Sequence, residues 1–172
     1  VASGMAHRTI VVSRSLQEYF SERGRRPIWI PNGVAALRRR PLDRLRRFGL
    51  GPRKFVLWMG RFVPEKRCED LIDAFRASRA DAKLLLAGEI DEEDGYVRSL
   101  RHRAAGDNRI VFAGGLYGAE KEEALSHAAL IALPSELEGL PLALLEGMSA
   151  GVCALAADIP PSREAIEDGR TG

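Results

Sequence analysis

Short apolar runs alternate with helix-like segments along most of this chain, and this alternation restricts the possible folds more than any other feature. The runs are only four or five residues long and lie at 55–59, 83–87, 109–112, 130–133 and 152–156. Parallel strands that are covered by helices on both faces have this pattern. It predicts an α/β fold with a Rossmann-like, doubly wound parallel sheet, in which ligands bind beyond the carboxyl ends of the strands.

A smaller unit is expected at the N-terminus. A strand, a helix capped by Ser13 and a second strand are predicted before residue 30. Pro31-Asn32-Gly33 is a turn signature, because Asn and Gly tolerate positive φ. We therefore expect residues 1–30 to be the tail end of an N-terminal domain with a linker, and residues 31–172 to form the main domain. At 172 residues, the chain is short for two complete α/β domains.

Two cations follow the apolar run that ends at Gly60. Arg61 and Lys66 lie five residues apart in a loop that leads to a helix. Arg offers a planar fork of donors, Lys a mobile charge, and a helix N-terminus adds free N–H groups, so this loop suits a diphosphate. The alternative is a solvated loop in which Glu65 neutralises one of the cations.

An acidic pair, Glu138 and Glu146, flanks the start of a helix predicted at 142–150. Gly139 permits close backbone approach to a ligand, and Pro141 suits a first helical turn. Glu146 has mostly apolar neighbours, where an unpaired carboxylate costs several kcal/mol in order-of-magnitude terms. Because a carboxylate accepts hydrogen bonds, Glu146 suits the two vicinal hydroxyls of a ribose, as acidic residues do in dinucleotide sites. A salt bridge to a nearby Arg is the alternative.

The order and spacing of these segments resemble the donor-binding domain of retaining glycosyltransferases with the GT-B fold, group 4. The motifs are Ile30-Pro31-Asn32-Gly33-Val34, Gly60-Arg61 with Lys66, Leu133-Pro134-Ser135, Glu138 with Glu146, and Glu167 to Gly172. The resemblance covers nearly all of residues 28–172. It implies one half of a GT-B fold, with residues 1–26 matching only the end of the other half and the chain stopping before the family's last strand and helix.

The resemblance also implies a role for each matching residue. The donor-binding residues would be Gly60, Arg61, Lys66, Gly114, Glu138, Gly139, Leu140, Pro141 and Glu146, with Arg61, Lys66 and Glu138 as the catalytic ones. Arg61 and Lys66 would bind the diphosphate, Glu146 the ribose, and Glu138 would lie against the transferred sugar. Residues 139–141 would lend backbone N–H groups, and the strand around 111–114 would line the base.

The activity implied is transfer of a hexose from a nucleotide sugar, UDP- or GDP-linked, to an acceptor hydroxyl with retention of configuration. We expect it to need no metal or other cofactor, and to serve polysaccharide or glycolipid assembly. The isolated fragment is expected to be inactive without its N-terminal domain. Two other readings stay open: a sugar-nucleotide epimerase of the same fold, and a non-enzymatic module that binds a nucleotide sugar or a partner.

Several classes are disfavoured by motifs that the sequence lacks. There is no Gly-x-x-x-x-Gly-Lys-Ser/Thr and no Gly-x-Gly-x-x-Gly, so NTPases and dehydrogenases are not favoured. The three histidines share no metal-ligand spacing, and Ser135 does not lie in a Gly-x-Ser-x-Gly elbow. Cys68 and Cys153 are far apart, which fits a reducing, cytoplasmic setting.

The charge pattern gives one further hypothesis. A formal net charge of +2 does not call for nucleic acid as a partner. The run from Arg38 to Arg47 is densely basic, however, and such runs can dock on anionic membrane surfaces. The alternative is a solvated loop and helix face. Peripheral membrane contact is therefore an expectation for the intact enzyme.

Overall fold

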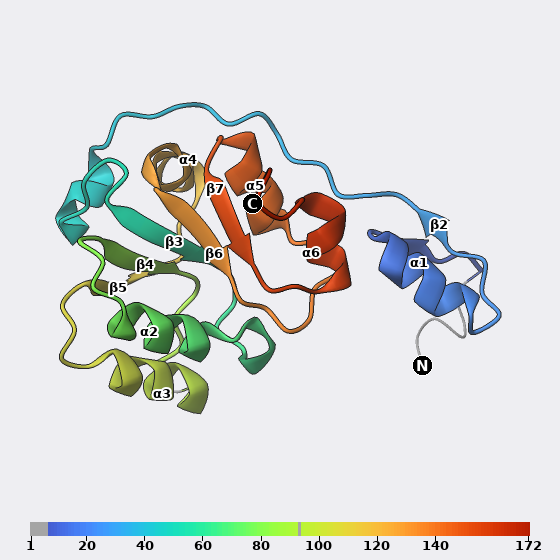
Figure 1. Cartoon of the computed structure of the whole chain (residues 1–172), viewed down its shortest axis with the longest axis horizontal. Coiled ribbons are helices and arrows are strands. Elements are labelled where there is room, and N and C mark those ends of the chain that lie inside the picture. Colours follow the sequence, from blue (N-terminus) through green and yellow to red (C-terminus); the bar gives the residue numbers. More distant parts are fainter. Residues whose placement is uncertain (1–6, 93) are drawn as a thin grey trace.

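The computed structural model describes residues 7–92 and 94–172, which contain a five-stranded parallel sheet with helices on both faces (Figure 1). The strands are β3 (Phe55–Met59), β4 (Lys83–Ala87), β5 (Ile110–Gly114), β6 (Leu130–Leu133) and β7 (Cys153–Ala156), in the spatial order β5-β4-β3-β6-β7. The helices are α2 (Cys68–Ala77), α3 (Gly95–Ala104), α4 (Gly118–His127), α5 (Leu142–Ser149) and α6 (Pro160–Ala165). The predicted α/β doubly wound sheet is confirmed.

The direction of winding reverses after β5. The chain moves outward from β3 to β4 and β5, and then returns to place β6 on the other side of β3. Right-handed crossovers then require the later helices to lie on the opposite face, and Figure 1 shows α2 and α3 on one side of the sheet and α4 and α5 on the other. The point where the order reverses lies between β3 and β6.

The element boundaries differ slightly from the sequence prediction. The strand predicted at 109–112 is β5, which continues to Gly114, and the helix predicted to begin near Ser162 begins at Pro160. Proline fits the first helical turn because its missing N–H would be unpaired there. The helix α5 ends one residue before the predicted end. Such shifts of one or two residues leave the site elements in place.

The core is formed by the apolar strands. Phe55, Leu57 and Trp58 are fully buried, as are Leu84 to Leu86 on the neighbouring strand. The Trp58 ring stacks on Phe62, with ring centroids 4.9 Å apart. Burying one such side chain stabilises a fold by about 1.5–3 kcal/mol, so these strands contribute directly to the stability of the sheet.

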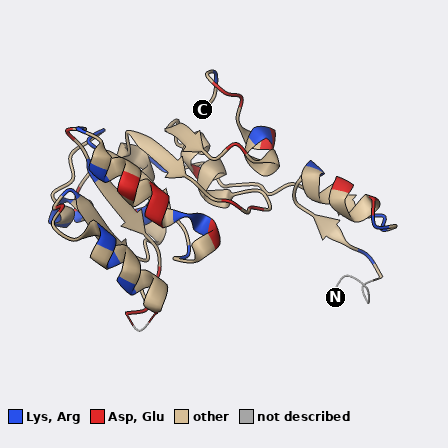
Figure 2. Ribbon diagram, turned by 60° about the horizontal axis from the view of Figure 1, so that its bottom comes forward, with Lys and Arg blue, Asp and Glu red and all other residues tan. Residues whose placement is uncertain are grey.

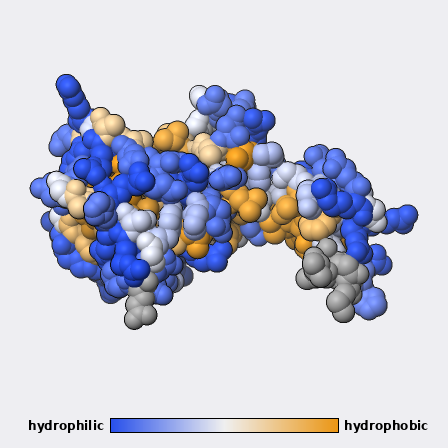
Figure 3. All heavy atoms as spheres, turned by 90° about the horizontal axis from the view of Figure 1, so that it is seen from below, coloured by the Kyte–Doolittle hydropathy of each residue, from blue (hydrophilic) through white to orange (hydrophobic). Residues whose placement is uncertain are grey.

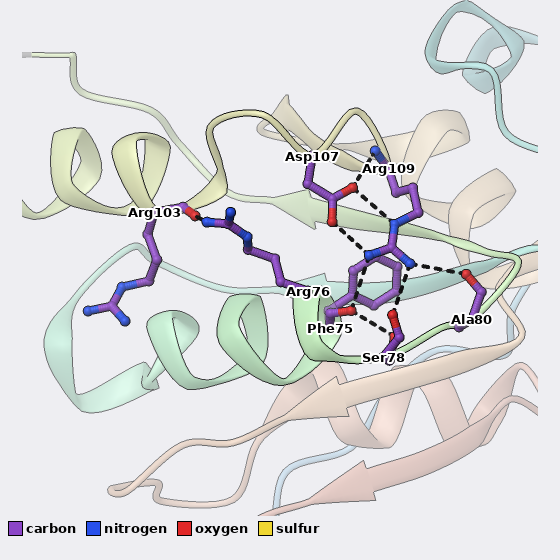
Figure 4. A network of polar contacts seen from close by, with 7 residues as sticks. All are labelled: Phe75, Arg76, Ser78, Ala80, Arg103, Asp107 and Arg109. Carbon is purple, nitrogen blue, oxygen red and sulfur yellow. Dashed lines mark hydrogen bonds and ion pairs between the residues drawn. The ribbon is translucent and has the colours of Figure 1, made fainter.

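Charged residues fasten α2 to its neighbours. The acidic face of α2 lies beside the basic face of α3 (Figure 2), and Arg103 pairs with Asp73 across this contact. At the far end of α2, Arg109 donates to the carbonyls of Phe75, Ser78 and Ala80 (Figure 4). These bonds cover carbonyls at and just beyond the end of α2, of which the Phe75 carbonyl also accepts from the N–H of Ser78 at 3.1 Å.

Asp107 completes this network. It accepts from the Arg109 guanidinium at 2.7 Å, and this hydrogen bond lowers the pKa of the Asp107 carboxyl. The network lies at the amino end of β5, away from the carboxyl edge where ligands bind in such sheets. Its role is therefore to hold the fold.

The linker after residue 30 is anchored on α4. The buried side chain of Glu123 accepts hydrogen bonds from the backbone N–H groups of Asp43 at 2.6 Å and Leu45 at 2.9 Å. Leu45 is the buried residue of the short 3₁₀ helix η2 (Arg44–Phe48). A carboxylate that accepts backbone N–H groups at a helix start both satisfies these donors and complements the helix dipole.

The described part of the N-terminal segment stands apart from the five-stranded sheet (Figure 1). It consists of β1 (Ile10–Val11), α1 (Arg14–Ser21) and β2 (Ile28–Trp29), with β1 and β2 paired in parallel, and the first six residues lie outside the described part. Hydrophobic side chains are exposed on this segment (Figure 3), among them Ile10 and Ile28. No described helix is long and apolar enough to cross a membrane.

Candidate functional site

Two loops meet at the carboxyl edge, where the order of the sheet reverses. One follows β3 and carries Gly60 and Arg61, and the other follows β6 and leads to Glu138. The N–H of Glu136 donates to the carbonyl of Glu65 at 2.9 Å, which ties the loops together. The two segments that the sequence singled out independently therefore meet at the edge where doubly wound sheets bind ligands.

An ion pair joins these loops. Nζ of Lys66 lies 2.7 Å from Oε1 of Glu138, and the two side chains are only 18% and 10% exposed. Lys66 is the last residue of the short 3₁₀ helix η3 (Pro64–Lys66), and its N–H donates to the carbonyl of Val63 at 2.9 Å. Glu65, the neutralising partner considered as the alternative, makes no ion pair among the described residues. Glu138 is the carboxylate that pairs with Lys66.

Arg61 differs from Lys66. Its side chain is exposed, and within residues 7–92 and 94–172 no carboxylate lies within ion-pair distance of its guanidinium. A guanidinium has five N–H donors in a rigid fork, so Arg61 keeps its full capacity for an anionic ligand.

A cavity of about 290 Å³ opens at the ends of β3, β4 and β5. It is lined by Met59, Gly60, Arg61, Ala87, Gly88, Glu89, Gly115, Leu116, Tyr117, Lys121 and Glu146. Three of these, Gly60, Arg61 and Glu146, are predicted donor-binding residues. Lys66 and Glu138 are not among the lining residues, although Lys66 lies in the loop that begins with Gly60 and Arg61.

Glu146 projects from α5 and is paired with a residue that the sequence did not single out. Its Oε1 lies 2.7 Å from Nζ of Lys121, and the two side chains are 25% and 36% exposed. The salt bridge considered as an alternative for Glu146 thus exists, with a lysine in place of an arginine. No hydrogen bond to the second carboxylate oxygen is formed within the described residues, so Glu146 can still accept from a ligand.

Lys121 lies in the first turn of α4, 25 residues before Glu146. In the sequence it looks like a solvated surface lysine between acidic residues. The one signal that could have indicated Lys121 was its position in the first turn of α4, because α4 starts at the same sheet edge as the two loops.

Tyr117 and Glu89 form the other side of the cavity and were also missed. The Tyr117 hydroxyl donates to Oε1 of Glu89, and this hydrogen bond raises the pKa of the Tyr117 phenol. The phenol therefore stays protonated at neutral pH and places an aromatic ring beside the cavity. Aromatic faces suit stacking with a planar base.

One of the expected donor contacts needs correction, and another stays a prediction. Pro141 cannot lend a backbone N–H, because proline has none; it is the N-terminal cap residue of α5. Gly114 is not among the cavity-lining residues: its carbonyl accepts from the N–H of Gly88 at 3.0 Å, and the next three residues form the wall instead. Gly114 turns the chain there with a φ of +76°, which favours glycine.

Gly139 and Leu140 can still donate backbone N–H groups to a ligand, as the family resemblance implies. Their backbone N–H groups have no acceptor within the described part of the chain. Oxygen atoms of a diphosphate or a sugar could accept hydrogen bonds from both N–H groups. Among the described residues, no group of His, Cys, Asp and Glu side chains is arranged to hold a metal ion.

Comparison with known proteins identifies the family. The model of the family described as "Glycosyl transferases group 1" matches residues 46–172, which is most of the chain. The protein belongs to this family. The match includes every residue predicted to bind the donor.

Curated relatives of this glycosyltransferase family are longer than the chain. The protein is 31% identical to the alpha-D-kanosaminyltransferase of Streptomyces kanamyceticus over 73% of this chain and 33% of the relative. It is 27% identical to the GDP-mannose-dependent alpha-(1-6)-phosphatidylinositol monomannoside mannosyltransferase of Mycobacterium tuberculosis over 84% of this chain and 41% of the relative. The chain thus spans well under half of the length of each.

Two solved structures share the fold. Anabaena Alr3699/HepE in complex with UDP and glucose superposes with a TM-score of 0.84 at 24% identity, over 95% of this chain and 48% of that one. The sucrose-phosphate synthase of Thermosynechococcus elongatus superposes with a TM-score of 0.82 at 23% identity, over 97% of this chain and 44% of that one. These likenesses support the GT-B, Rossmann-like assignment.

Proposed function

We propose that this chain is the donor-binding half of a retaining glycosyltransferase and binds a nucleoside diphosphate sugar, UDP- or GDP-linked, at the carboxyl edge of its sheet. The main support is that Arg61 and Glu146 line one cavity at the carboxyl edge, and that the loop carrying Arg61 also carries Lys66, which pairs with Glu138 on the loop after β6. Among similar proteins, one was solved in complex with UDP and glucose and another is GDP-mannose-dependent.

The arrangement suggests how the donor would lie. Glu146 would accept from the ribose hydroxyls, and Tyr117 would cover the base. Arg61 and Lys66 would hold the diphosphate; an ammonium has three N–H donors, so Lys66 can contact a phosphate and keep its bond to Glu138. Glu138 would then face the sugar, in the position implied by the family resemblance.

In the proposed reaction, the bond between the sugar and the diphosphate breaks as the acceptor oxygen attacks from the same face. The acceptor's proton passes to an oxygen of the departing phosphate. Arg61 and Lys66 stabilise the negative charge that grows on this leaving group, which requires no metal. A covalent sugar adduct on Glu138 would contradict this route.

The charge argument gives a test on the full-length enzyme. Arg61→Ala is expected to lower turnover by about tenfold, because one fixed cation beside the leaving phosphate is lost. Steady-state kinetics with saturating donor measure this, and unchanged turnover would remove Arg61 from the mechanism.

Nucleotide binding by the chain itself tests the proposal as a whole. Calorimetric titration with UDP, GDP and ADP, and with their sugars, should show saturable binding of the nucleotides that carry one particular base. If the folded chain binds none of them, the proposal is contradicted and a partner-binding module is favoured instead.

A second Rossmann-like domain is proposed to supply the acceptor site. The exposed Ile10 and Ile28 on the two-stranded β1–β2 sheet suit packing against further strands of such a domain. Without it, the donor half should bind its nucleotide and show no transfer. An acceptor in polysaccharide or glycolipid assembly is proposed from the relatives, one of which glycosylates a phosphatidylinositol mannoside.

Peripheral membrane contact is proposed for Arg38 and Arg39, which are exposed, whereas Arg40 and Arg47 are paired with Glu122 and Glu120 on α4. Each free cation near an anionic membrane contributes about 1 kcal/mol. Replacing both Arg38 and Arg39 by alanine should therefore lower co-sedimentation with vesicles containing anionic lipid by about tenfold or more. Equal binding by the variant would contradict membrane contact through this run.

A further inference from the structure

The loop that connects β6 to α5 is poor in hydrogen bonds of its own. Within residues 7–92 and 94–172, the backbone of residues 137–140 makes one hydrogen bond, and its donor is the side-chain amide of Asn32. Nδ2 of Asn32 lies 2.9 Å from the carbonyl oxygen of Leu140, in a partly buried position. This contact joins residues 108 positions apart.

The N-terminal segment also packs directly on this loop. A Cβ added to Gly139 would lie 3.1 Å from Cγ2 of Val12 and 3.8 Å from Cδ1 of Leu16, so only a residue without a side chain fits here easily. Val12 and Leu16 flank the start of α1. The loop is therefore enclosed by the segment before the linker and bonded by the linker itself.

The N-terminal segment is fixed to the main domain at a second place. The carboxylate of Glu164 on α6 accepts from the backbone N–H groups of Arg14 at 2.7 Å and Ser15 at 2.9 Å. These are first-turn donors of α1 with no partner inside the helix. The position of α1, and with it Val12, is thus set by α6.

We propose that Asn32 is a positioning residue for donor binding: it holds the loop of residues 138–140 so that its free N–H groups face the diphosphate and sugar. This rests on the proposed function. The loop's side-chain tie, Lys66–Glu138, fixes Glu138 but leaves the backbone at Gly139 and Leu140 free to turn. The bond to the Leu140 carbonyl fixes the orientation of the following peptide, which joins the loop to α5.

The two ends of the ligand would contact different parts of the site. Glu146 and the cavity residues lie on α5, α4 and the ends of the strands, and within the described residues none of them forms a hydrogen bond with Asn32. Loss of the Asn32 bond should therefore weaken contacts to the diphosphate and sugar, and leave contacts to the base and ribose unchanged. A merely structural role would weaken both equally.

The test compares Asn32→Ala and Asn32→Asp with the wild-type chain. The matched control is Asn108→Ala, because Asn108 is exposed near the amino end of β5 and makes no side-chain hydrogen bond within the described residues. Each is titrated with the nucleoside monophosphate and the nucleoside diphosphate sugar of the base that the wild type binds. Asn32→Ala should bind the diphosphate sugar about tenfold more weakly and the monophosphate within about twofold of wild type.

Asn32→Asp should bind the diphosphate sugar at least as weakly as Asn32→Ala, because a carboxylate cannot donate and would face the Leu140 carbonyl. Wild-type affinity for the diphosphate sugar in both variants, or equal losses for the two ligands, would overturn the proposal while leaving the donor site intact. If the wild type binds neither ligand, the proposed function itself falls and this proposal with it.

A second measurement needs no ligand. A glutamate-specific protease should cleave after Glu138 faster in Asn32→Ala than in wild type, since Glu138 is only 10% exposed while the loop is held. Cleavage elsewhere, for example after the exposed Glu22, serves as the internal reference. An unchanged ratio of the two cleavage rates would show that Asn32 does not hold the loop, whatever the nucleotide titrations give.

Discussion

Gly88→Ala is expected to destabilise the protein by about 3 kcal/mol, which is a large share of a typical total stability of about 5–15 kcal/mol. Gly88 directly follows β4, and a Cβ at this position would lie 2.1 Å from the carbonyl oxygen of Gly60. That oxygen is backbone at the end of the central strand β3, so it cannot move aside as a flexible side chain would. The ends of two adjacent strands would have to separate.

The same substitution should impair the donor site, because Gly88 and Gly60 both line the cavity. Chemical unfolding followed by circular dichroism measures the stability, and nucleotide titration measures the site. Gly33→Ala is the matched control: Gly33 has nothing within 4 Å of an added Cβ and no positive φ. Its stability should stay within about 0.5 kcal/mol of wild type or rise slightly. A Gly88 variant as stable as this control would contradict the steric argument.

Glu146→Ala is expected to weaken nucleotide binding by about 30- to 150-fold, or about 2–3 kcal/mol, because hydrogen bonds to a charged acceptor are worth about 1.5–3 kcal/mol each. The proposed ligands of the carboxylate are the two ribose hydroxyls, so nucleosides and nucleotide sugars of the same base should be affected alike. Calorimetric titration of the folded variant gives the affinity.

Two further variants test whether the loss of binding comes from the Glu146 carboxylate itself. Glu136→Ala removes a carboxylate of the loop before α5 that is 73% exposed and does not line the cavity, and it should leave binding unchanged. Lys121→Met removes the partner of Glu146 and shows how much of the loss comes from the broken ion pair. If Glu146→Ala binds as tightly as wild type, Glu146 is a structural ion-pair partner and the ribose assignment is wrong.

Much of the fold was predictable because it depends on local features. Each apolar run of four or five residues becomes a strand, and the helices between them follow. The sequence also indicated that Arg61 and Glu146 lie near the carboxyl edge, because the loop after a parallel strand and the first turns of the next helix lie at that edge. Their roles remain predictions, which the variants above address.

The partners of these residues were not predictable. Lys121 pairs with Glu146, and Lys66 pairs with Glu138 over a separation of 72 residues. No periodicity or motif in the sequence indicates which surface lysine faces which glutamate. That Gly114 contacts the donor stays a prediction: its carbonyl accepts from the N–H of Gly88, and the next three residues line the cavity.

The sequence by itself determined the strands, the helices and the edge of the sheet that carries the polar loops, because hydrophobic period and turn residues act over a few neighbouring positions. The tertiary structure alone decided which loops touch. It set the Lys66–Glu138 pair, the cavity wall of Glu89 and Tyr117, and the bond from Asn32 to Leu140. These contacts depend on the packing of segments far apart along the chain, and that packing is fixed only when the whole sheet closes its core.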